Sequence, residues 1–152
     1  MTRFFGFLLC ALLAGPALGG AWLSQKHGEA SLREGPGYNY RILWLYRHKG
    51  YPFALTASYD AWRRVRDADG IVGWMHVSML SDQRTVLVTG KTDTPLRAGS
   101  AANARVIGKA QPGAVARLKT CTPTACEIAA GDLDAWIDRK KLFGVDAGEV
   151  FH

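Results

Sequence analysis

The sequence of 152 residues contains little of what catalytic and metal sites are made of. It has three cysteines and four histidines, and none of them stands at a spacing typical of a metal site or of a nucleophile beside its base. His76 lies on a predicted strand without an obvious cysteine or serine partner, and the other histidines lie near the chain ends or among basic residues. We therefore predict a non-enzymatic protein with no catalytic residues, no metal and no cofactor.

Long hydrophobic runs are also scarce. A helix that crosses a bilayer needs about twenty apolar residues, and the apolar run at residues 4–14 is shorter. This run follows Arg3 and ends at Pro16 and several small residues, which is typical of a secretory signal peptide. We predict a cleaved signal peptide over residues 1–21, with cleavage after Gly19 as the alternative, and no membrane span after processing. An uncleaved anchor is the other interpretation of this run.

Acidic side chains are in the minority, with 13 Asp and Glu against 19 Lys and Arg, which gives a net charge of +6. Arg3 is the one charged residue of the predicted signal peptide, so 18 basic residues remain against 13 acidic ones, a net charge of +5. Export argues against nucleic acid as a partner. The charge suits an anionic wall polymer, anionic lipid headgroups or an acidic protein, and a merely solvated basic surface explains it equally well.

Only two cysteines follow the signal peptide, Cys121 and Cys126, in the segment Cys-Thr-Pro-Thr-Ala-Cys. In an oxidising compartment, a cysteine pair around a proline-containing turn predicts a disulfide. Closing so short a loop adds about 2 kcal/mol of stability. Strict alternation along a strand would point the two side chains to different faces, so the bond requires a bulge or twist near the turn. A metal site is the weaker interpretation, because the chain offers no second cysteine pair and no histidine-rich segment.

Helical patterns are absent as well, because no stretch of twelve residues combines a helical period with capping residues. Short strand patterns fill the chain instead. The clearest is a hairpin in which residues 62–66 and 71–77 are joined by Asp69-Gly70, a pair that turns readily. Residues 22–28 show no periodicity, and we interpret them as a polar lead-in.

The second half of the chain repeats the first. Residues 32–43 recur at an offset of 64, residues 50–65 at 63 and residues 74–80 at 62, so the offset changes only at segment ends and turns, where deletions are tolerated best. Short strands and frequent turn signals in each copy are typical of a small all-β sandwich or barrel. Trp74 recurs as Trp136, each after a small residue at the start of a return strand, and we assign both to the core.

A characteristic order of residues runs through the first copy: Leu32-Arg33-Glu34-Gly35-Pro36-Gly37, a hydrophobic strand ending at Gly50, and then Trp62, Val65, Gly73-Trp74 and Leu80. This order resembles the bacterial SH3-like domain, in particular the tandem versions in exported proteins of Gram-negative bacteria. The second copy is looser, with Gly99-Ser100 in place of Gly-Pro-Gly and Ala125 in place of Trp62.

The resemblance implies an all-β protein with two tandem, five-stranded, partly open barrels. We expect a signal peptide at 1–21, one SH3-like domain at 29–88, a degenerate second one at 89–144 and a tail at 145–152. Some members of the family target the cell wall, and the domain itself carries no catalytic residues. The resemblance thus implies a periplasmic binding protein.

Five residues are candidates for the binding surface: Tyr38, Tyr40, Trp62, Arg64 and Arg66. Aromatic rings beside guanidinium groups suit a sugar or a peptide with a carboxylate, because rings stack on apolar faces and arginine pairs with carboxylates. We therefore expect recognition of peptidoglycan peptide or glycan. The alternative is a structural adaptor that docks another envelope protein, and Trp62 could then simply cap the barrel.

Overall fold

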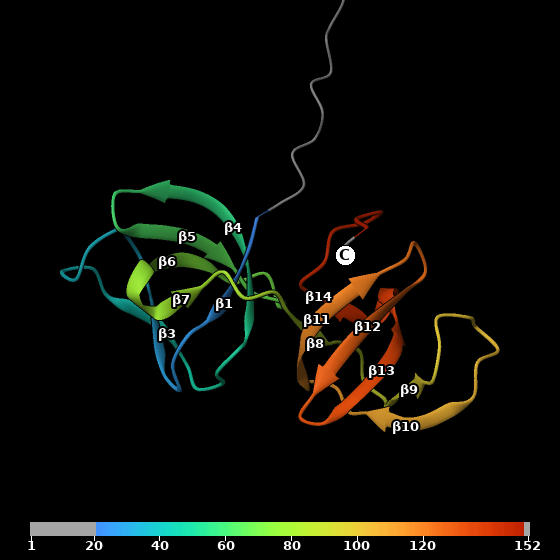
Figure 1. Ribbon diagram of the computed structural model, residues 1–152. Helices are drawn as coiled ribbons and strands as arrows, with labels where there is room; N and C mark the ends of the chain where they lie inside the picture. Colours follow the sequence, from blue (N-terminus) through green and yellow to red (C-terminus); the bar gives the residue numbers. More distant parts are fainter. Residues whose placement is uncertain (1–20, 151–152) are drawn as a thin grey trace, which may run out of the picture.

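The computed structural model describes residues 21–150, so the predicted signal peptide lies outside the described residues except for Ala21. The chain forms two antiparallel sheets of seven strands each, and neither sheet is closed. Figure 1 shows the two sheets side by side, the first in blue to green and the second in yellow to red. The all-β fold of two tandem SH3-like units is confirmed. Within residues 21–150, no helix has the length and hydrophobicity needed to cross a bilayer.

The first sheet has the strand order β3-β2-β6-β5-β4-β1-β7. Its elements are β1 (Trp22–Gln25), β2 (Ala30–Arg33), β3 (Ile42–Tyr46), β4 (Pro52–Tyr59), β5 (Trp62–Arg66), β6 (Val72–His76), the 3-10 turn η1 (Val77–Met79) and β7 (Leu80–Ser81). The predicted hairpin is formed by β5 and β6, which pair in register from Trp62 opposite His76 to Arg66 opposite Val72.

The second sheet has the strand order β10-β9-β13-β12-β11-β8-β14. Its elements are β8 (Thr85–Val88), β9 (Thr94–Arg97), β10 (Val106–Ala110), β11 (Val115–Cys121), β12 (Ala125–Ala130), β13 (Leu133–Asp138), the 3-10 turn η2 (Arg139–Lys141) and β14 (Leu142–Phe143). Each element stands seven strands after its counterpart in the same order, so the predicted tandem repeat is present as a repeated topology.

Two strand assignments from the sequence were wrong. Residues 22–25 form β1 rather than a polar lead-in, and residues 85–88 form β8, which pairs with β11 and β14 of the second sheet rather than ending the first domain. In β1 the buried residues are Ser24 and Gln25, so the strand carries no apolar alternation to detect. These strands and the two-residue β7 and β14 raise the number from the expected five to seven per unit.

Each unit has its own hydrophobic core. The first is built from Ala30, Leu32, Tyr46, Phe53, Val65, Met75 and Leu80. The second is built from Val86, Val88, Leu96, Ala110, Ala116, Leu118, Cys121, Cys126, Ile128, Ala135 and Ile137. Trp74 and Trp136 are half-buried and belong to neither core, so their assignment was wrong. Successive strand residues point to opposite faces, and it is Met75, Ala135 and Ile137 that point inward.

The predicted disulfide between Cys121 and Cys126 is present, with an S–S distance of 2.04 Å. The two residues face each other across β11 and β12, one pair before the turn. The register of this hairpin shifts between Leu118 and Thr120. That shift is the irregularity that the bond was expected to need.

The two units touch along the short connection between them. Thr85 Oγ1 donates a 2.6 Å hydrogen bond to the carbonyl of Gly50, and the rings of Trp22 and Phe143 meet edge to face at 4.9 Å. The segment predicted as a tail folds back onto the second unit, because both carboxylate oxygens of Glu149 accept hydrogen bonds from Arg84.

Candidate functional site

Three rings meet on the outer face of the first sheet. Tyr38 comes from the loop between β2 and β3, Trp62 begins β5, and His76 ends β6 directly opposite Trp62. The ring centroids lie 5.0 Å apart for Tyr38 and Trp62, 5.5 Å for Tyr38 and His76, and 5.2 Å for Trp62 and His76. We call these three side chains the ring cluster.

The side chain of Arg33 on β2 holds the loop that carries Tyr38. One nitrogen of this guanidinium, Nη1, donates to the carbonyls of Tyr38 at 3.0 Å and Tyr40 at 2.8 Å. The guanidinium also lies 5.4 Å from the centre of the Tyr38 ring. At Gly35 any side chain would overlap the ring of Tyr40, so the glycine of the Gly-Pro-Gly segment lets the loop fold over tightly. The loop therefore presents Tyr38 in a fixed place.

Exposure separates the members of the ring cluster. Tyr38 is 61% exposed, whereas Trp62 is 8% exposed. Trp62 thus supports the other rings and covers the end of the sheet, while Tyr38 offers a face and an edge to solvent. Of the five candidate residues, the structure brings Tyr38 and Trp62 into contact. His76 completes the cluster, and sequence analysis missed it because its role follows from pairing opposite Trp62.

Arg64 lies beside the ring cluster on the same face of β5, two residues after Trp62. Its partner on β6 is Trp74, which in turn pairs with Arg33 on β2. Directly paired residues in antiparallel strands share a face, so two arginines flank a half-buried indole next to the ring cluster. Arg64 is exposed, and its guanidinium makes a long 3.4 Å hydrogen bond to Thr56.

The remaining two candidates lie elsewhere. Tyr40 is half-exposed and packs over Gly35 and Gly37 rather than against the ring cluster. Arg66 lies at the far end of β5, with its guanidinium 5.6 Å from the centre of the Phe143 ring in the second unit. Tyr40 is therefore part of the loop between β2 and β3, and Arg66 is part of the contact between the two units.

His76 does have a serine partner, contrary to the expectation from the sequence. Its Nδ1 lies 2.8 Å from the hydroxyl oxygen of Ser78 and accepts a hydrogen bond from the Ser78 amide. The imidazole thus caps the N-terminus of η1, a role that side chains often take at the start of a helical turn. Within residues 21–150, no three His, Cys, Asp or Glu side chains are grouped so that they could hold a metal ion.

Comparison with known proteins bears on the first unit. Residues 26–82 match the family model of the bacterial SH3 domain. Among solved structures, the chain is similar to NlpC2 from Trichomonas vaginalis, with a TM-score of 0.37 and 10% sequence identity over 82% of this chain. The match spans 48% of that protein, so this chain corresponds to about half of its length. No curated protein matches the sequence.

Proposed function

We propose that this chain, whose residues 26–82 match the bacterial SH3 domain, is an exported, non-enzymatic binding module that recognises cell-wall peptidoglycan in the periplasm. The ligand would be the peptide or the glycan of the wall. The ring cluster of the first unit, together with Arg64, would form the contact surface. The N-terminal apolar run supports export, because its length and flanking residues are typical of a signal peptide.

The observation that carries this proposal is the exposed ring of Tyr38, fixed by Trp62, His76 and Arg33. A ring that is already held in place loses little conformational freedom on binding. It can stack on the apolar face of a sugar or on a peptide bond. Arg64 lies beside it with its guanidinium exposed, so a carboxylate of a wall peptide can pair with it.

Sedimentation of the purified protein with isolated sacculi tests the proposal. Tyr38→Ala should weaken the binding at every salt concentration, since a stacking contact is not screened. Arg64→Ala should weaken it by roughly fivefold at low salt and little at high salt, because exposed charge pairs contribute at most about 1 kcal/mol and are screened. Trp62→Ala is a poorer test, because Trp62 is buried and its loss also costs packing.

Arg66→Ala is the matched control, since Arg66 is an exposed arginine on the same strand that lies toward Phe143 rather than the ring cluster. It should sediment like the unaltered protein. Failure of the unaltered protein to sediment at low salt would refute the proposal. Equal binding at low salt by Tyr38→Ala, Arg64→Ala and the control Arg66→Ala would refute the assigned surface.

A second function, docking of another envelope protein, is favoured by a different surface. The edge strand β3 exposes three large apolar side chains, Ile42, Leu43 and Trp44, the last of them 52% exposed. Open sheet edges with apolar side chains readily pair with another chain. If the protein is an adaptor, the Trp44→Ala variant should no longer bind its partner protein, whereas the Tyr38→Ala variant should still bind it. Crosslinking in the periplasm measures this difference. The wall-binding module predicts the opposite pattern in sacculus sedimentation.

A further inference from the structure

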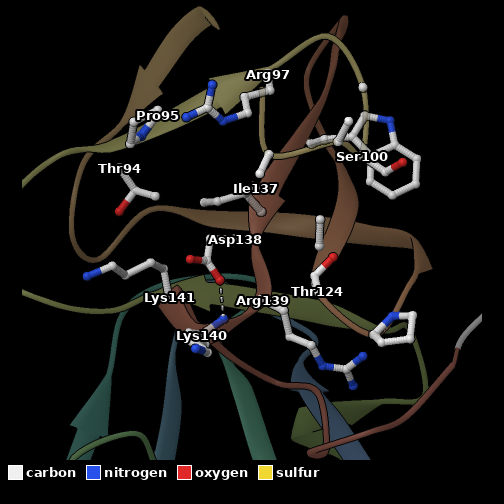
Figure 2. A pocket seen from close by; sticks show the side chains of 16 residues that line it. Thr94, Pro95, Arg97, Ser100, Thr124, Ile137, Asp138, Arg139, Lys140 and Lys141 are labelled. Atoms are coloured by element: carbon white, nitrogen blue, oxygen red, sulfur yellow. Dashed lines mark hydrogen bonds between the residues drawn. The ribbon is translucent and has the colours of Figure 1, made fainter. Parts of the chain in front are cut away.

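The second unit has a pocket where the first unit has the ring cluster. Its volume is about 350 Å³. Residues that line it include Pro95, Arg97, Ser100, Thr124, Ala125 and Trp136. Figure 2 shows Arg97 and Ser100 on one side of the pocket and Lys140 and Arg139 on the other.

The pocket exists because the repeat replaces rings by small side chains. Ala102 stands at the offset of 64 from Tyr38, Ala125 at 63 from Trp62, and Asp138 at 62 from His76. Ala102, Ala125 and Asp138 all line the cavity.

The backbone around the pocket keeps the frame of the first unit. Arg97 Nη1 donates to the carbonyl of Ala104 at 2.9 Å, as Arg33 does to Tyr40. The amide of Ala98 donates to the carbonyl of Arg105 at 2.9 Å, which matches the bond from Glu34 to Arg41. The loop therefore follows the same path in both units, although the second unit carries no rings there.

The charge around the pocket has changed together with its shape. The turn η1 of the first unit is Val77-Ser78-Met79, and the corresponding η2 is Arg139-Lys140-Lys141. Arg139 is buried and donates to the carbonyls of Thr122 and Asp146, so it serves the structure.

Lys140 and Lys141 are exposed, and no carboxylate among residues 21–150 forms an ion pair with either. The one carboxylate of the lining, on Asp138, accepts a 2.9 Å hydrogen bond from the backbone amide of Lys140. Arg97 adds a further positive charge from the opposite side. The lining thus has four basic side chains and one acidic one, and two of the basic side chains have no ion-pair partner in the part of the chain that the structure describes.

We propose that this pocket binds an aromatic carboxylate, of the kind presented by the C-terminal aromatic residue of a peptide. The space suits a flat ring, because the same frame holds rings in the first unit and because Pro95 and Trp136 border it. The lysine ammonium groups and Arg97 suit the carboxylate. This site goes beyond wall recognition, because it uses the other unit and a different ligand.

The test is a titration of the full protein with N-acetyl-L-tryptophan, followed by amide and indole resonances in NMR. N-acetyl-L-tryptophanamide is the uncharged control ligand of the same shape. The acid should shift the resonances of Ala102, Ala125 and the Trp136 indole, and it should bind roughly fivefold more tightly than the amide, the scale of an exposed charge contact. No shift at these residues, or equal affinity for acid and amide, would overturn the proposal.

Charge variants locate the carboxylate. The double substitution Lys140→Gln and Lys141→Gln should remove the preference for the acid over the amide. Lys26→Gln with Lys91→Gln makes the same charge change at exposed positions outside the pocket and should leave the preference intact. A preference that survives the first pair or disappears in the second would place the anion elsewhere.

A filling variant tests the space. Ala125→Trp installs the residue of the first unit and should abolish binding of both ligands. If this variant does not fold, Ser100→Trp on the exposed loop narrows the same pocket and should have the same effect. Neither change should affect sedimentation with sacculi, which depends on the first unit. Tighter binding of N-acetylmuramic acid than of N-acetyl-L-tryptophan would overturn the aromatic class and assign the pocket to wall sugar instead.

Discussion

Removal of one hydroxyl group from the first core, in Tyr46→Phe, should destabilise the protein measurably. Tyr46 is buried, and its hydroxyl donates a 2.7 Å hydrogen bond to Oδ2 of Asp67. Asp67 is buried as well, and its Oδ1 accepts from the amides of Asp69 and Ile71 at 3.0 and 2.8 Å. The bond therefore ties β3 to the turn of the hairpin between β5 and β6.

The expected loss of stability in Tyr46→Phe can be estimated from the contacts that phenylalanine retains. Its ring retains the edge-to-face contact of Tyr46 with Phe53, whose centroids lie 4.9 Å apart, so packing changes little. The loss is a hydrogen bond to a buried carboxylate, which contributes about 1.5–3 kcal/mol. We expect the free energy of unfolding of the first unit to fall by about 2 kcal/mol.

Urea unfolding followed by tryptophan fluorescence measures this loss. Four of the five tryptophans lie in the first sheet, and Trp136 is the one in the second, so the signal reports mainly on the first unit. Tyr59→Phe is the control, because Tyr59 is 62% exposed. A midpoint for Tyr46→Phe that equals the midpoint of this control would refute the reasoning.

The same bond predicts how stability depends on pH. Burial and the hydrogen bond to Asp67 raise the pKa of Tyr46 well above its ordinary value, and burial also raises the pKa of Tyr51. A pKa raised by folding gives stability that is complete below the unfolded value of about 10 and is lost as the pH rises above it. Tyr46→Phe should therefore lose less stability above pH 10 than the unaltered protein does. An alkaline slope unchanged by the substitution would contradict this.

Two further changes have predictable costs. Replacing Cys121 and Cys126 by alanine should lower the stability of the second unit by about 2 kcal/mol, measured by chemical unfolding, and an unchanged midpoint would speak against the bond as a stabilising link. Gly144→Ala should cost more than about 1 kcal/mol in thermal unfolding, because Gly144 has a φ of +120° and a side chain there would run into the backbone of Thr85. Gly148→Ala meets open space at a φ of +76° and should cost less, and equal costs would refute the steric argument.

The repeat and its register could be read from the sequence because hairpins fix which residues face each other. Ser58 and Arg63 pair across β4 and β5, as Cys121 and Cys126 pair across β11 and β12. Both pairs follow from a single offset of 63. The same offset aligns Trp62 of the first unit with Ala125 of the second. That this replacement leaves a pocket in place of a ring could be seen only in the structure.

The sequence did not show which side chains of the return strands β6 and β13 point into the core. In β6, small Gly73 and Met75 face the core and Trp74 faces outward, because a side chain at Gly73 would overlap Leu32. A tryptophan after a glycine gives no sign of which of the two points inward. His76 was missed for the same reason, since its contact with Trp62 depends on the phase of β6.

The two units resist unfolding by different means, which leads to a last prediction. Ala110 and Ala130 stand at the positions of Tyr46 and Asp67, at offsets of 64 and 63, so the second unit lacks the buried hydrogen bond. It has the disulfide instead. Small units bury too little apolar surface to be robust alone, and each copy adds one link of its own.

Reducing agent and alkaline pH should therefore act on different units. Reduction at neutral pH should lower the stability around Trp136 and leave the resonances of Trp62 unchanged. A pH above about 10 should do the reverse, because the buried phenol of Tyr46 then favours the unfolded state. Amide exchange or residue-resolved NMR during unfolding separates the two. Loss of both units together under either condition would show that the contacts through Thr85 and Phe143 couple them more strongly than their separate links allow.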